Sequence, residues 1–135
     1  QDHRLGYRVR VADDVREAAV RSVRAAGRPH AGATLVLAAA GEADDYLRVE
    51  MAEAALELGE AEGLAVLIGV MDESPARQAR RDAHEHLVIH TGVAMPFDAA
   101  APPEANDDQA GLYRAWWEEH RHELRYDPAT GRFHP

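Results

Sequence analysis

The chain has 135 residues, the usual size of one domain, and a formal charge of −9 with no cysteine. The missing cysteine excludes disulfides, thiolate metal sites and a cysteine nucleophile, and the acidic balance argues against a nucleic-acid partner. No apolar run approaches the roughly 18 residues of a membrane span and no signal peptide is visible, which leaves open a cytoplasmic location or export after leader removal.

The first part of the chain predicts an extended arm followed by two helices. Residues 1–12 alternate apolar and polar side chains, but no second segment shows a pattern that would pair with them as a strand. From Asp13 the apolar spacing becomes helical, and it ends at Gly27, just before Pro29. A second, shorter helix is expected over residues 31–40, closed by Gly41.

The middle of the chain predicts three further helices. One opens at Asp44 or Asp45 and ends at Gly59, and the next spans residues 61–71. The latter is apolar all round, which is typical of a helix packed between neighbours. Ser74 is expected to cap the start of a fifth helix, which stops at Gly92.

The last third predicts a linker and a cap. Residues 93–106 are rich in proline and alanine and are interpreted as a linker. A sixth helix is expected over residues 107–125, followed by turn-forming residues, so that residues 107–135 form a C-terminal capping helix and tail. Within this helix we expect Trp116 to be the more important core residue, in one stripe with Leu112 and Tyr113.

The three long helices repeat with an almost constant spacing. Their terminal glycines are 32 and 33 residues apart, and an arginine precedes each glycine by eleven positions. The arginines, Arg16, Arg48 and Arg81, are predicted to link neighbouring repeats. Repeats of this length indicate a solenoid, because one helix pair cannot bury its apolar face alone. We therefore predict an all-α fold, with about three stacked helix pairs over residues 13–92.

Several segments are similar to those of a known repeat family. Asp14-Val15-Arg16 before an alanine-rich helix resembles the first helix of a HEAT repeat, and residues 64–68 resemble a second helix. Residues 91–98 look like the exit from the last repeat of bacterial HEAT-repeat proteins, and residues 113–119 and 131–133 look like their closing tail. The short period and the proline in the first repeat keep TPR-like and other helix-pair classes open.

Two groups of polar side chains are candidate sites. Glu50, Glu53 and Glu57 belong to an acidic ridge that we interpret as a solvated face able to meet a basic partner. His86 and His90 are four residues apart and share a helix face, which makes them weak candidates for metal ligands. The repeat alignment places both histidines at outer positions, so no metal and no other cofactor is expected.

The resemblance implies a binding function more readily than a catalytic one. HEAT-type solenoids present a curved surface lined by their second helices, and the contact residues expected from this arrangement are Val66, Gly69 and Val70. No convergent catalytic set is apparent, so the predicted function is a non-catalytic, protein-binding scaffold that is part of a larger HEAT-repeat protein. The alternatives are an enzyme accessory of the HEAT-like lyase type and a histidine-based metal-handling protein.

Overall fold

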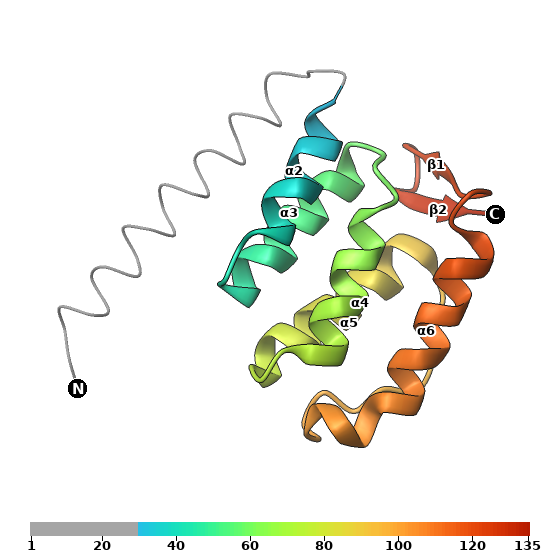
Figure 1. Ribbon diagram of the computed structural model, residues 1–135. Coiled ribbons are helices and arrows are strands. Elements are labelled where there is room, and N and C mark those ends of the chain that lie inside the picture. The colour runs from blue at the N-terminus through green and yellow to red at the C-terminus, as the bar shows by residue number, and fades with distance from the viewer. Residues whose placement is uncertain (1–29) are drawn as a thin grey trace, which may run out of the picture.

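The computed structural model describes residues 30–135, and this part of the chain is mostly helical (Figure 1). The expected arm, the first helix and Arg16 lie outside the described residues. The elements are α2 (Ala31–Ala40), α3 (Asp45–Glu57), α4 (Gly63–Glu73), α5 (Arg77–Thr91), the 3-10 helix η1 (Pro103–Asn106), α6 (Asp107–His120), β1 (Arg125–Asp127) and β2 (Arg132–His134). The predicted predominance of helices is confirmed.

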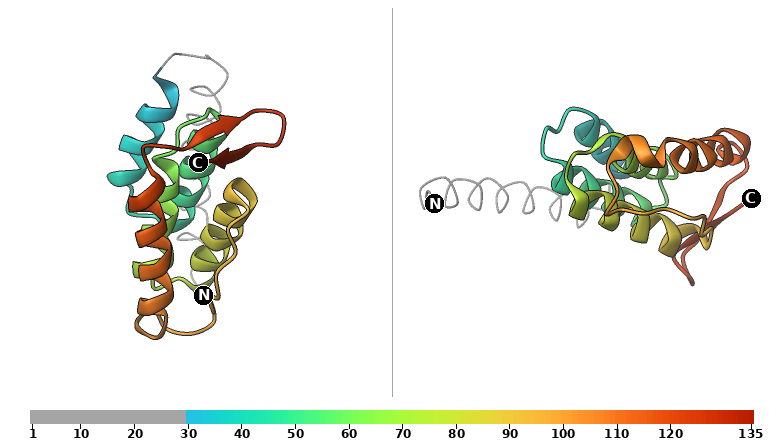
Figure 2. Two further views of the ribbon diagram at one scale, coloured as in Figure 1. Left: turned by 90° about the vertical axis from the view of Figure 1, so that its right-hand side faces the viewer. Right: turned by 90° about the horizontal axis from the view of Figure 1, so that it is seen from below.

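The helices from α2 to α5 each pack against the next one along the chain. α3 also contacts α5, and α4 contacts both α2 and α6. The two views of Figure 2 place α5 and α6 on opposite sides of α4. Helix α4 therefore has neighbours on several sides, which explains why its sequence is apolar nearly all round.

Two glycines fit the close packing and the helix ends. A Cβ atom on Gly63 would lie 2.8 Å from the carbonyl oxygen of Ala52, so the start of α4 approaches α3 more closely than another residue allows. Gly92 has a φ of 72°, and its N–H donates to the Val88 carbonyl at 2.7 Å. Its left-handed conformation ends α5 at the residue that the sequence predicted.

The main core gathers side chains from α3, α4, α5, α6 and β2. Tyr113, Trp117 and Phe133 belong to the same buried cluster as the apolar residues of α4. The expectation for the tryptophans was wrong: Trp117 is 4% exposed, Trp116 is only partly buried, and Leu112 is 55% exposed. The helix turns about 100° per residue, and the face that it presents to α4 follows Tyr113 and Trp117, four residues apart.

A buried arginine fixes the connection between α5 and α6. Arg80 is 3% exposed and donates to the carbonyls of Ser74, Ala99 and Ala101 at 2.8, 2.8 and 2.9 Å. After the end of α5 the chain therefore runs back to the start of α5 before α6 begins. Residues 93–106, interpreted as a linker, include two of the three carbonyls that Arg80 binds, those of Ala99 and Ala101.

The predicted inter-repeat arginine bonds are not found in the described residues. Arg81, next to Arg80, is largely exposed and pairs with Glu85 of its own helix. Arg48 pairs with Asp45, also within its own helix. The arginine of α5 that does bond to other segments is Arg80, one residue before the position that the glycine alignment selected. Equal spacing along the chain does not determine which face of a helix is buried.

The C-terminal tail contains a small hairpin that the sequence reading did not foresee. β1 and β2 pair antiparallel, with Tyr126 opposite Phe133. Phe133 is buried in the core, and the Nδ1 atom of His90 lies 2.8 Å from the carbonyl of Gly131. The strands are only three residues long, too short for their apolar alternation to be distinguished from a turn.

Candidate binding groove

A groove of about 370 Å³ lies between α4 and α6, with one further wall from α3. The α4 side presents Glu62, Ala65, Gly69 and Glu73, which share one face because they are spaced by three or four residues. The two small residues at the middle of this stripe keep the floor low, while the two glutamates stand near its ends. The volume is in the range of small ligand sites and accommodates one or two side chains of a partner.

The α6 side is held against α4 by two ion pairs. Arg114 Nη2 lies 3.1 Å from Asp72 Oδ2, and Arg121 Nη2 lies 3.1 Å from Glu62 Oε1. Asp72 is near the end of α4 whereas Glu62 directly precedes its start, so the two helices run antiparallel. Trp117 lies between the two arginines in sequence and lines the groove.

Arg121 makes several contacts at one end of the groove. Its Nη1 atom lies 3.5 Å from Glu118 Oε2, and its Cζ atom lies 5.3 Å from the centroid of the Trp117 ring. The neighbouring Glu62 carboxylate raises the pKa of Arg121, so this guanidinium stays charged. Charge at this end is largely matched inside the groove itself.

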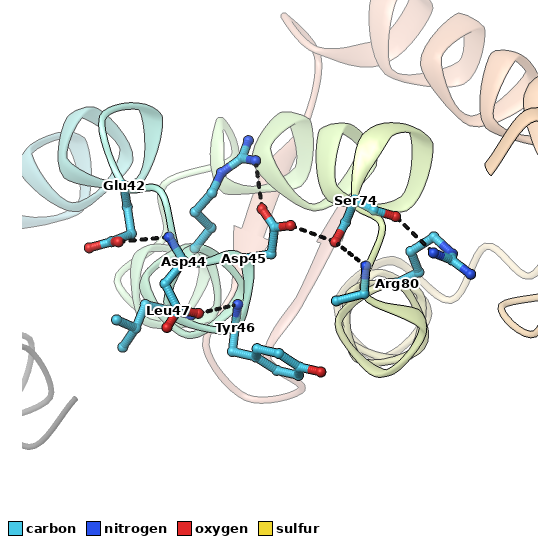
Figure 3. Close-up of polar contacts among 9 residues, drawn as sticks. Glu42, Asp44, Asp45, Tyr46, Leu47, Ser74 and Arg80 are labelled. Carbon is cyan, nitrogen blue, oxygen red and sulfur yellow. Dashed lines mark hydrogen bonds and ion pairs between the residues drawn. The ribbon is translucent and has the colours of Figure 1, made fainter. Parts of the chain in front are cut away.

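Arg48 supplies the α3 wall, and a chain of hydrogen bonds fixes it there. Its Nη1 atom lies 3.2 Å from Asp45 Oδ1, while Asp45 Oδ2 accepts a 2.6 Å hydrogen bond from the Ser74 hydroxyl (Figure 3). The Ser74 oxygen in turn accepts from the N–H of Ala76, directly before α5. Ser74 thus links the end of α4 and the residue before α5 to the start of α3. The expected capping of α5 by Ser74 is not found: the N-cap residue of α5 is Ala76, and Ser74 is the C-cap residue of α4.

Gly69 leaves open space beside Arg48. The nearest atom that a Cβ at this position would meet is Arg48 Nη2, at 3.7 Å, an ordinary van der Waals contact. The Nε atoms of Arg48 and Arg121 are buried without a hydrogen-bond partner. Since a guanidinium offers five donors, both arginines retain donor capacity beside the groove after their ion pairs are counted.

The predicted contact residues divide into two kinds. Gly69 lines the groove and Val66 is partly buried on α4, where it packs against both core clusters. Val70 is fully buried, so its side chain cannot contact a partner in this structure. The correction follows from the helical turn, which places Val70 on the core face, about 100° from Gly69.

The acidic ridge is less uniformly solvated than predicted. Glu57 is exposed and Glu50 is half-buried, but Glu53 Oε2 lies 2.7 Å from His86 Nε2 on α5. This contact lowers the pKa of Glu53 and raises the pKa of His86, since each charge stabilises the other. Part of the ridge therefore serves the packing of α3 on α5.

The histidines on α5 do not occupy the outer positions that were expected. His86 is part of the contact with Glu53, and His90 is 7% exposed and bound to the hairpin. His84 is half-buried; its Nε2 atom lies 2.9 Å from the Tyr113 hydroxyl, and burial lowers its pKa. Within residues 30–135, no three histidine or acidic side chains are grouped so that they could hold a metal ion.

The groove residues on α6 and directly after it were not predicted, although the sequence carries a signal for them. Arg114, Trp117 and Arg121 follow the helical spacing of three and four that marks one face. Trp116 was predicted instead because it shares a helical stripe with Leu112 and Tyr113. The partner helix for this face was not predictable, because the connection of residues 93–106 is long enough to allow several arrangements.

No described helix is long and apolar enough to cross a membrane. Comparisons with protein-family models, with curated proteins and with solved structures find no match for this chain.

Proposed function

We propose that this chain is a non-catalytic protein-binding module, and that a partner protein binds in the groove between α4 and α6. The groove itself carries the proposal: it is open, is lined by three arginines, three glutamates and a tryptophan, and has a floor of small residues. Arginine is among the residues that contribute most to protein–protein binding energy. The ion pairs that hold Arg48, Arg114 and Arg121 reduce the side-chain entropy lost when a partner docks.

The module is further proposed to be a short α-solenoid of the HEAT-like type, part of a larger repeat protein. Sequential packing of α2 to α5, together with the α2–α4 and α3–α5 contacts, supports this interpretation. In such a stack α4 is a second helix, and second helices line the binding surface of HEAT-type solenoids. The repeat spacing of 32 and 33 residues in the sequence favours the same reading.

The test compares two arginine variants of the full chain as bait in extracts of its native host. Arg114→Glu reverses a charge in the groove, whereas Arg81→Glu reverses one outside it; both arginines are substantially exposed and paired with one carboxylate. We expect wild type and Arg81→Glu to capture the same protein and Arg114→Glu to lose it. The purified partner should then bind the first two chains directly. Equal capture by Arg114→Glu would refute a role for the groove.

A further inference from the structure

The groove carries a specific charge pattern that restricts what it can bind. Its three guanidiniums, on Arg48, Arg114 and Arg121, come from α3 and from α6 and the turn that follows it. Its three carboxylates are on Glu62, directly before α4, on Glu73 at the end of α4, and on Glu118 in α6. A purely acidic ligand would meet the carboxylates and a purely basic ligand the guanidiniums, so either would be opposed by like charge.

The two ends of the groove differ in how far their charges are satisfied. At one end Arg121 contacts both Glu62 and Glu118, which uses the charges of all three. At the other end Arg48 and Arg114 contact only Asp45 and Asp72. Those aspartates do not line the groove, and the two arginines keep further donors beside it.

Gly69 lies beside Arg48, between the middle of the groove and this second end, and provides the space for a ligand group. Within 4 Å, a Cβ atom on Gly69 would meet, among the described residues, only Arg48 Nη2. A carboxylate placed over Gly69 can accept hydrogen bonds from Arg48, which is held in position by Asp45, itself bound to the Ser74 hydroxyl. Glu73, one turn further along the same face of α4, is exposed and able to receive a cation.

We infer that the groove binds a partner segment of mixed charge, with a carboxylate side chain seated over Gly69 against Arg48 and Arg114, and a lysine or arginine against Glu73. This inference rests on the proposed function and names the chemistry of the partner. Charge complementarity selects this occupant over an apolar segment, because the groove is walled mainly by charged side chains. The overall charge of −9 disfavours a segment that is acidic throughout.

The experiment uses a library of random peptides displayed on phage and selected on the immobilised full chain. Selected peptides are synthesised, and their affinities are measured for wild type, Gly69→Leu and Gly111→Leu. Gly69→Leu fills the groove, whereas Gly111 lies on the exposed face of α6, where a Cβ atom would meet no atom of residues 30–135 within 4 Å. Both changes replace a helical glycine by a better helix former, so both variants should fold.

We expect peptides that contain Asp or Glu together with Lys or Arg, weakened about tenfold or more by Gly69→Leu and little by Gly111→Leu. Arg114→Glu should weaken them similarly, and replacing the peptide's acidic residue by arginine should restore binding to that variant. Peptides that need the groove but are apolar or of one charge sign would overturn this inference and leave the proposed function standing. Peptides insensitive to Gly69→Leu would contradict both, and failure to select any peptide would count against the inference.

Discussion

Replacing Trp117 by alanine should destabilise the protein far more than replacing its neighbour Trp116. Trp117 is 4% exposed in the core that joins α4, α5 and the hairpin, whereas Trp116 is only partly buried. Truncation of a buried tryptophan to alanine typically costs about 3–5 kcal/mol. The Trp117 change also removes the ring beside which Arg121 lies.

These magnitudes are large relative to the total stability of a domain, which is about 5–15 kcal/mol. For a domain of this size each kcal/mol corresponds to roughly 4 °C in the melting temperature, so Trp117→Ala should melt about 12–20 °C lower than wild type. Trp116→Ala should cost about 1–2 kcal/mol, because a partly buried ring loses less contact on truncation.

The assay is urea and thermal unfolding of the full chain followed by far-ultraviolet circular dichroism. Trp117→Phe is the matched control, since it keeps an aromatic ring in the core and should recover most of the lost stability. An equal or larger loss for Trp116→Ala would refute the packing of α6 on α4 described above. Full stability of Trp117→Ala would show that α6 is not an integral part of the core.

Three further changes probe other parts of the structure. Arg80→Leu should cost about 3 kcal/mol, because it leaves three carbonyls without their donor, and Arg81→Leu should cost less than about 0.5 kcal/mol; denaturant titration measures both. Gly69→Ala should be neutral or stabilising by up to about 1 kcal/mol, which a loss of melting temperature would contradict. The His86–Glu53 pair should contribute most to the free energy of unfolding between pH 4.5 and 6.5, the ordinary pKa values of Glu and His. Its contribution should fall at higher pH, as His86 loses its proton at its raised pKa, and at lower pH, as Glu53 gains a proton at its lowered pKa. The stability difference between wild type and His86→Gln, measured across pH, would be flat if the pair were absent.

Most helix positions were predictable because the apolar spacing and the end signals agree, although α6 ends at His120 rather than at the expected residue 125. Asp44, predicted with Asp45 as a possible start, accepts hydrogen bonds from the backbone N–H groups of Tyr46 and Leu47 (Figure 3), and α5 ends at Gly92. Such signals are local, so they can be recognised without knowing the neighbours of a helix.

The candidate site was harder to predict because it depends on which helices meet. Gly69 was singled out from its place on an expected second helix, but the groove residues Arg114 and Trp117 come from a helix more than forty residues further on. Their position in the same groove follows from the return of the chain along α5, which Arg80 fixes through non-local hydrogen bonds. No periodic pattern in the sequence encodes that return.

The central claim is that a partner occupies the groove between α4 and α6, and site-specific photo-crosslinking tests it most directly. A photoreactive residue is introduced at Glu118 on the groove wall and, in a second chain, at Leu37 on α2, the most exposed large apolar residue in the described part of the chain, at 75%. Irradiation in host extracts should give a covalent adduct with one partner protein from position 118 and none with that protein from position 37. An adduct formed from position 37 alone would contradict the account and place the partner on the apolar face of α2.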